Sequence, residues 1–389
     1  MFGIIGNMKA DKRIKLKEGS LMERLAKIRQ LMTEEKLDGL IVTTAANRRY
    51  LSGFTGSSGI LVISQEHAVL LTDFRYLDQA AEEVKAYGFQ VKKHQPAILE
   101  TVAEEIKAQG TKARSKWGFE SENLVEKAYR TLQAKLDRGI LTPTEGLVNR
   151  LRRIKSVDEL GSIRKAVEIT DQAWARLQPE LKPGRTEKEI AALFEYFQRE
   201  LGAEGAAFPT IVASGPRSAL PHGVPTDKKI AAGDLLVLDG GAVYNGYCSD
   251  FTRTVVVGAA PTADQQALYD LVLKAQQAAL DGMRPGVTGK DVDALARKVI
   301  AEAGYGERFG HGLGHSLGLE IHEAPRLALT DETVLETGVV YTVEPGIYLA
   351  DWGGIRIEDV VVVTETGIED LTASPKTIIL DSEDRHMVK

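Results

Sequence analysis

The sequence predicts two domains: an α/β domain with a mixed sheet, then an α+β domain with a pseudo-two-fold internal repeat. Three observations support this fold class. Residues 21–145 alternate helical and strand-like patterns, a later segment is duplicated, and each copy of it precedes a strand pair that carries two carboxylates. Alternating helices and strands are typical of α/β domains, and 389 residues are enough for two cores.

The N-terminal pattern begins with an amphipathic helix at 21–37, in which apolar residues recur on one helical face. Short runs rich in valine, isoleucine and leucine predict the strands. The other elements are expected in this order: strands at 39–43, 60–64 and 68–72, a helix from about 76, a strand at 88–91, a helix from 98, a strand at 117–120 and a helix from 124. Turn-forming residues at 143–146 predict a domain boundary near residue 148.

After two long helical segments, near 158–177 and 187–201, the chain shows its internal repeat. L-K-P-G-R-T-E-K-E-I-A-A-L at 181–193 recurs as M-R-P-G-V-T-G-K-D-V-D-A-L at 283–295. In each copy a threonine follows a Pro-Gly turn, and an acidic residue stands three positions after the threonine, which predicts a capping box at a helix start. Two such halves facing each other would bring their carboxylates to one centre.

The first carboxylate pair lies on a predicted hairpin. An Asn-Gly turn at 245–246 separates apolar strands at 235–238 and 252–257. This register puts Asp250 opposite glycine 241 and places Asp239 two residues further along the same face. Such diagonal neighbours are roughly 7–8 Å apart at the backbone, so their carboxylates could converge on one ion.

The second pair, Glu344 and Glu358, lies on strands predicted at 340–349 and 355–363, with 351–354 in the turn. Folding about residue 351 places the two glutamates directly across from each other. Facing like charges destabilise a strand pair unless a cation lies between them. A pair of divalent cations is the simplest explanation.

Between the two hairpins runs H-G-L-G-H-S-L-G-L-E-I-H, with His311, His315 and His322. The first two histidines are four residues apart, as in a zinc-protease helix. However, Gly312 stands where that motif requires glutamate, and the frequent glycines disfavour a helix. Four carboxylates and an imidazole together predict a two-metal hydrolase.

Composition excludes several classes of partner. A net charge of -6 and a pI near 5.8 give no basic surface for nucleic acid, and no apolar run is long enough to span a membrane. The one cysteine, Cys248, cannot form an intrachain disulfide, and we expect a cytoplasmic protein. Residues 1–20 are expected to be a weakly ordered leader segment.

Three further motifs carry a family resemblance: N-R-R-Y-L-S-G-F-T-G-S-S-G (47–59), L-T-D-F-R-Y (71–76) and I-V-A-S-G-P-R-S-A-L-P-H-G (211–223). Together with the carboxylate and histidine motifs, they resemble bacterial Xaa-Pro peptidases of the aminopeptidase P and prolidase group over residues 21–380. The resemblance implies a creatinase-type N-terminal domain at 21–148 and a pita-bread catalytic domain at 149–389.

The resemblance also implies the roles of individual residues and the partners. It implies five ligands for two divalent metal ions: Asp239, Asp250, His315, Glu344 and Glu358. Manganese or cobalt is favoured, and zinc or iron is chemically acceptable. The catalytic residues would be His222, His322 and Glu344, and the substrate-binding residues His222, His311, His322 and Arg356. The substrate would be a peptide with proline at its second position, and the protein a homodimer.

Several activities stay open. Aminopeptidase P removes the first residue of longer peptides, and we favour this activity; prolidase cleaves only Xaa-Pro dipeptides. An arginine that reads the free carboxylate would favour the dipeptidase, and the candidates are Arg48, Arg49, Arg217 and Arg356. The complete ligand set argues against a creatinase-like amidine hydrolase and a non-catalytic binding protein, and the extra N-terminal domain argues against a methionine aminopeptidase.

Overall fold

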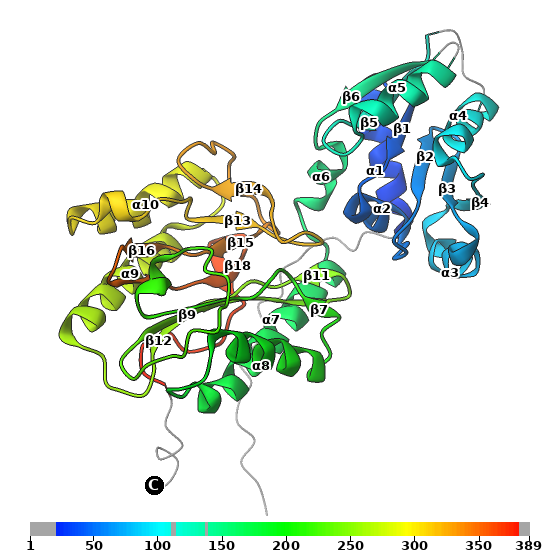
Figure 1. The fold of residues 1–389 in the computed structure, drawn as a ribbon. Coiled ribbons are helices and arrows are strands. Elements are labelled where there is room, and N and C mark those ends of the chain that lie inside the picture. Colours follow the sequence, from blue (N-terminus) through cyan, green and yellow to red (C-terminus); the bar gives the residue numbers. More distant parts are fainter. Residues whose placement is uncertain (1–20, 110–113, 137–138, 381–389) are drawn as a thin grey trace, which may run out of the picture.

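The computed structural model describes residues 21–109, 114–136 and 139–380, and these residues form two units joined near α6 (Figure 1). The predicted leader at 1–20 lies outside the described residues. The N-terminal unit consists of α1 (Leu21–Glu34), β1 (Gly39–Val42), α2 (Ala45–Ser52), β2 (Ile60–Ser64), β3 (Ala68–Thr72), α3 (Leu77–Glu83), β4 (Gln90–Lys93), α4 (Ile98–Ala108), β5 (Lys116–Glu120), α5 (Glu126–Lys135), β6 (Ile140–Thr144) and α6 (Leu147–Arg152).

The six strands form one mixed sheet in the order β4-β3-β2-β1-β5-β6. The β1–β2 and β2–β3 pairs are antiparallel, whereas the other three pairs are parallel. Helices α1, α2 and α6 pack on one face, and α4 and α5 pack on the other. Alternate residues of the buried strands therefore face two different helical layers, and the predicted mixed sheet is confirmed.

Three elements of this unit were missing from the sequence prediction: α2, β6 and α6. Helix α2 buries Asn47 and Arg48, so its sequence lacks the apolar periodicity of a surface helix. The predicted boundary residue, Val148, lies within α6 and packs with Leu147 in the N-terminal core. The division of the chain into two domains at this point stays a prediction.

The C-terminal unit contains two successive sets of elements. The first set is α7 (Val157–Leu177), α8 (Glu187–Glu200), β7 (Gly205–Ala206), β8 (Ile211–Ser214), β9 (Leu235–Asp239), β10 (Ala242–Tyr244), β11 (Tyr247–Cys248) and β12 (Thr252–Val256). The second set is α9 (Ala263–Gly282), α10 (Gly289–Glu302), β13 (Gly314–Ser316), β14 (Glu323–Leu327), β15 (Val340–Val343), β16 (Gly346–Leu349), β17 (Gly353–Arg356), β18 (Asp359–Val363) and β19 (Ile368–Asp370).

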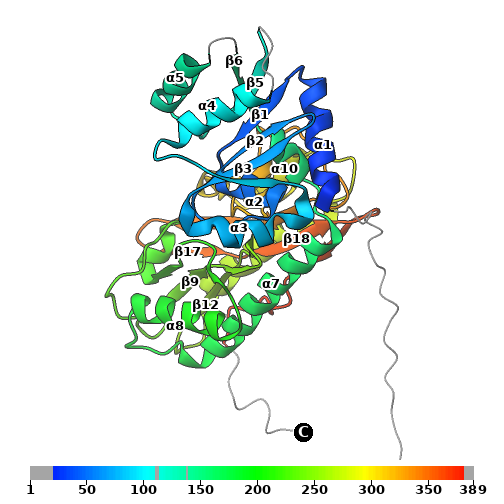
Figure 2. The same ribbon diagram turned by 90° about the vertical axis from the view of Figure 1, so that its right-hand side faces the viewer.

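Each set packs its own pair of long helices on its own strands. Helices α7 and α8 cover β8, β9 and β12, and helices α9 and α10 cover β15 to β18. Figure 2 shows β9, β12 and β17 close together in the middle of this unit, with α7 and α8 outside them. The backbone N–H of Glu358 donates to the Thr252 carbonyl at 3.2 Å, so the two sets of strands meet.

The duplication extends to corresponding backbone contacts. Thr186 forms an isolated antiparallel bridge with Lys229, and Thr288 forms the same kind of bridge with Val334. Both threonines also form the predicted capping box with the acidic residue three positions later. The internal repeat is thus one structural unit built twice. Among the described residues, no helix combines the length and apolarity that a membrane span requires.

We predict that Thr186→Ala and Thr288→Ala each lower the free energy of unfolding by about 1 kcal/mol, because each removes an N-cap hydrogen bond. Urea denaturation monitored by circular dichroism would measure the change. Ser162→Ala is the matched control, since among the described residues the Ser162 hydroxyl bonds only to the Asp158 carbonyl inside α7. Equal midpoints for all four proteins would contradict the capping assignment.

Candidate metal centre

The nine residues to which the sequence analysis gives metal-binding, catalytic or substrate-binding roles all line one cavity of about 610 Å³. They come from the β9–β12 hairpin, the β15–β18 hairpin, the loop around β13 and the segment after β8. These residues are His222, Asp239, Asp250, His311, His315, His322, Glu344, Arg356 and Glu358. Segments more than a hundred residues apart therefore converge on a single place.

The predicted aspartate hairpin is confirmed in its register. Asp239 pairs with Thr252, and the chain reverses at Asn245 and Gly246, which both have positive φ. Asp250 consequently lies opposite Gly241, as predicted. A Cβ at Gly241 would lie 1.9 Å from the Ser249 carbonyl oxygen, so this position has no space for a side chain.

The predicted glutamate pair is also confirmed. Val343 pairs with Asp359 and Gly346 with Arg356, and this register brackets Glu344 opposite Glu358. Two details differ from the prediction. The long strands are interrupted at the glutamates, which gives the separate pairs β15–β18 and β16–β17, and glycines 353 and 354 belong to β17 instead of the turn. The tip is formed around Asp351, which has a φ of 63°.

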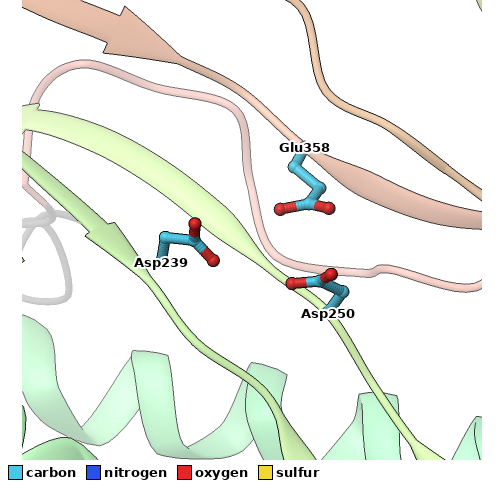
Figure 3. Close-up of side chains that lie close together, drawn as sticks. All are labelled: Asp239, Asp250 and Glu358. Atoms are coloured by element: carbon cyan, nitrogen blue, oxygen red, sulfur yellow. The ribbon is translucent and has the colours of Figure 1, made fainter. Parts of the chain in front are cut away.

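Three carboxylates form the centre of the site. Asp239, Asp250 and Glu358 each offer an oxygen within 4.8 Å of the others, and all three residues are buried. Figure 3 shows their side chains pointing toward one another from neighbouring segments. Three anionic groups this close and this buried require positive charge between them or protonation.

His315 and Glu344 extend this cluster. The His315 Nε2 lies 3.3 Å from Glu344 Oε1 and 3.6 Å from Asp250 Oδ2. Its Nδ1 lies 3.1 Å from the Ser316 carbonyl oxygen, which can only accept a hydrogen bond. In the neutral ring the proton is therefore on Nδ1, and the Nε2 lone pair faces the carboxylates.

The protonation energetics show the excess of negative charge. Burial raises the pKa of Asp250 and Glu358 well above the ordinary value, and the neighbouring carboxylates raise it further. Burial lowers the pKa of His315, but the hydrogen bond and charge of Glu344 and the charge of Asp250 raise it to about 9. The cluster therefore attracts a positive charge.

Two buried oxygens are suited to accept that charge. Asp239 Oδ1 and Glu358 Oε1 have no hydrogen-bond partner within the described part of the chain. An unpaired buried carboxylate oxygen is costly, and a bound cation would remove the cost. Oxygen and imidazole donors suit divalent ions such as Mn²⁺, Co²⁺, Fe²⁺ or Zn²⁺. The residues present therefore fit a divalent metal centre.

Arg356 and His311, both predicted to bind substrate, meet at a phenol that the sequence analysis missed. Arg356 donates to Asp239 Oδ2 at 2.6 Å and to the Tyr348 hydroxyl at 2.9 Å. The His311 Nε2 lies 3.0 Å from the same hydroxyl. The alternation of side chains along a strand could have indicated Tyr348, because residues four positions apart point to the same face and Tyr348 follows Glu344 by four.

Thr252 is a second missed residue of the site. Its hydroxyl donates to Glu358 Oε2 at 2.7 Å and accepts from Arg356 Nε at 3.2 Å. Its position directly opposite Asp239 was the available signal. Thr252 and Arg356 together leave Glu358 Oε1 and Asp239 Oδ1 as the unpaired oxygens.

His222 and His322 lie at the more exposed side of the cavity. The His322 ring stands edge-on to the His315 ring, with 4.4 Å between the ring centroids. Burial lowers the pKa of His322, and the neighbouring His315 lowers it further. The segment that carries His222 is anchored by Glu187, whose carboxylate accepts hydrogen bonds from Ser214, Arg217 and Thr226.

Of the four arginines considered as carboxylate readers, only Arg356 lines this cavity. Arg48 donates to carbonyls of its own domain, Arg217 pairs with Glu187, and Arg49 lines a different cavity. Arg326, which the sequence analysis missed, does line the cavity. It follows His322 by four residues and pairs with His315 across β13 and β14.

Comparison with known proteins agrees with this arrangement. Residues 161–365 match the model of metallopeptidase family M24, and residues 24–154 match the creatinase/prolidase N-terminal domain. A protein of Pyrococcus furiosus named Xaa-Pro dipeptidase is 42% identical over 363 residues, which cover 92% of this chain and 100% of the relative.

Solved structures show the same likeness across both units. A structure titled Xaa-Pro dipeptidase from Bacillus anthracis has a TM-score of 0.88 at 44% identity, covering 92% of this chain and 100% of its own. An X-Pro aminopeptidase from Thermotoga maritima has a TM-score of 0.85 at 40% identity, with coverages of 91% and 99%. With its creatinase-type N-terminal domain and its pita-bread C-terminal domain, the chain belongs to metallopeptidase family M24.

Proposed function

We propose that this protein is a dinuclear metal-dependent exopeptidase that hydrolyses the bond between a first residue and a following proline. The observation that carries the proposal is the convergence of four carboxylates and His315 at the floor of one cavity. Relatives in the same family bear the names Xaa-Pro dipeptidase and X-Pro aminopeptidase, which supports the choice of substrate.

Within this proposal, Asp239 would chelate one metal ion, and His315 and Glu344 would hold the other. Asp250 and Glu358 would serve both ions. Asp250 suits that role because it belongs to the three-carboxylate cluster and also lies 3.6 Å from His315. Manganese is the ion that we favour, and cobalt, zinc and iron suit the same donors.

When bound, two divalent cations supply Lewis acidity and lower the pKa of water. Glu344 would take a proton from the attacking water and deliver it to the departing nitrogen. Burial raises the pKa of Glu344, but the hydrogen bond and charge of His315 outweigh burial and lower it. The ionised carboxylate is the form that can accept a proton. The departing nitrogen needs that proton because an unprotonated amide anion is a poor leaving group.

The exposed histidines, His222 and His322, would act on the carbonyl side of the bond. His322 stands beside His315 and would donate a hydrogen bond to the oxygen as negative charge develops on it. His222 lines the same cavity and would hold the scissile carbonyl. Arg356 and His311 would act closer to the metal, since both bond to Tyr348 and Arg356 also bonds to Asp239.

The length of the substrate separates two candidate activities. The N-terminal motifs favour an aminopeptidase that acts on longer peptides. The position of Arg326 in the cavity favours a dipeptidase, because a guanidinium pairs well with the free carboxylate of an Xaa-Pro dipeptide. The proposal also includes a cytoplasmic location, consistent with a single buried cysteine, and a homodimer.

The substrate assay uses manganese-loaded protein with Ala-Pro and with a longer peptide that begins Ala-Pro. We expect hydrolysis of the Ala-Pro bond in at least one substrate. If Arg326 reads the carboxylate, Arg326→Met should raise KM for the dipeptide by about tenfold or more and change KM for the longer peptide less. Arg284→Met, at an arginine outside the cavity, is the control. Activity on neither substrate would overturn the proposed function.

Metal content tests the proposed ligands directly. Asp250→Ala and Glu358→Ala should each lose both ions, because each carboxylate serves both. Elemental analysis of the purified variants measures the stoichiometry. Asp227→Ala is the control, since Asp227 pairs with Lys188 on the surface and should leave two ions bound. Two ions per chain in either site variant would remove that residue from the bridging position.

A further inference from the structure

The loop from Ser316 to Glu323, which follows His315 and carries His322, lies between the two domains. Leu319 in this loop packs against the N-terminal core and also against the cluster formed by α7 and β18. The two ends of the loop are neighbours, because Ser316 in β13 pairs with Glu323 in β14. His322 is therefore attached directly to the anchored end of an interdomain loop.

The anchor is a buried charge cluster. The Glu323 carboxylate accepts a hydrogen bond from Arg152, at the end of α6, through Oε1, and one from Lys155 through Oε2 at 3.1 Å. Arg152 also donates to the Asn47 side-chain oxygen of α2 at 2.6 Å and pairs with Glu320 at 2.8 Å. The cluster thus connects helix α2 of the N-terminal unit to the residue that follows His322.

The cluster holds both ends of the loop. The Lys155 Nζ lies 3.3 Å from the Ser316 hydroxyl, so one ammonium contacts the residue after His315 and the residue after His322. Gly318 packs against the same carboxylate, and a Cβ there would lie 2.7 Å from Glu323 Oε1. The loop therefore has little room to move while Glu323 stays bound.

Because the charged groups of this cluster are buried, each depends on its partners for stability. The side chains of Arg152, Lys155 and Glu323 are 3%, 1% and 7% exposed. Removing one partner of a buried pair leaves an uncompensated charge, so the remaining groups must rearrange or admit water. Burial raises the pKa of Glu323, but the charges of Lys155 and Arg152 outweigh this effect and lower it, in agreement with an ionised carboxylate.

The Arg152 cluster is not the only contact that joins the two domains among the described residues. Arg24 of α1 approaches Glu159 of α7 at 3.7 Å, and the same glutamate accepts from the Tyr247 hydroxyl at 2.8 Å. That second tie joins the domains through α7 and ends on no residue adjacent to a site histidine. The distinctive feature of the Arg152 cluster is its endpoint next to His322.

We propose that Arg152 and Lys155 are positioning residues for His322. By holding Glu323 they hold the neighbouring imidazole beside His315, so the N-terminal domain takes part in building the site. The inference rests on the proposed function, because it assigns His322 a role in turnover. Arg152 and Lys155 themselves do not line the cavity.

A double-mutant cycle tests the coupling. Arg152→Ala should lower kcat on the better substrate by about tenfold or more while metal content stays at the wild-type level, because a misplaced donor loses transition-state contact. In a His322→Ala background the same change should cost less than about twofold. Arg152→Lys should recover part of the loss. An equal loss in both backgrounds would overturn the proposal.

Two controls separate positioning from general loosening. Arg150 lies on α6, like Arg152, and Arg150→Ala removes its exposed ion pair with Glu35. Arg24→Ala weakens a different interdomain tie, the pair with Glu159. Both variants should keep kcat within about twofold of the wild type, since neither contacts the His322 loop. A loss in Arg24→Ala as large as that in Arg152→Ala would show that only domain docking matters.

A readout without activity keeps the inference independent of the proposed reaction. In metal-free protein, the imidazole NMR resonances of His322 should shift in Arg152→Ala and in Glu323→Gln, and stay unchanged in Arg150→Ala. Glu323→Gln preserves the size of the side chain and serves if Arg152→Ala fails to fold. Unchanged His322 resonances in both variants would overturn the proposal, whereas a shift together with an inactive wild type would refute only the proposed function.

Discussion

Four carboxylates at one centre, of which Asp239, Asp250 and Glu358 are buried, impose the constraint on which the rest of this structure depends. Without compensating charge, burial and mutual repulsion raise the pKa of Asp250 and Glu358. Arg356 and His315 supply part of the compensation through Asp239 and Glu344. Oxygens of Asp239 and Glu358 remain unpaired, and metal ions of an M24 peptidase would satisfy them. Holding these carboxylates together without cations costs free energy, and the hydrogen bonds of the surrounding strands offset that cost.

The surrounding strands come from both halves of the duplicated unit, which contact each other at the site. The Thr254 hydroxyl donates to the Arg356 carbonyl at 2.9 Å, and the fully buried Arg253 donates to the carbonyls of Thr252 and Glu358. Arg253 also pairs with Asp359 at 2.9 Å. Because these bonds hold the backbone on either side of the ligand positions, the carboxylates stay together despite their repulsion. Such supporting contacts orient metal ligands in general.

The N-terminal domain takes part in the same construction. Its α6 ends in a charge cluster that reaches the loop between His315 and His322, and Leu319 packs against both domains. The exposed side of the site is therefore built at a domain junction, a common location for ligand pockets. In the proposed function, the carboxylates on the strands would bind the ions, and the histidine loop, held by the N-terminal domain, would orient the substrate.

The sequence by itself determined the local geometry. The Asn-Gly turn and the spacing of the glutamates set the register of both hairpins, and the Thr-x-x-acid pattern set two helix starts, since each feature depends on neighbours within a few residues. Only the tertiary structure decided that Tyr348 joins His311 to Arg356, that Arg326 lines the cavity, and that Arg152 meets Glu323. These contacts join residues distant in the chain through the packing of layers, and no local pattern encodes which buried polar groups will meet.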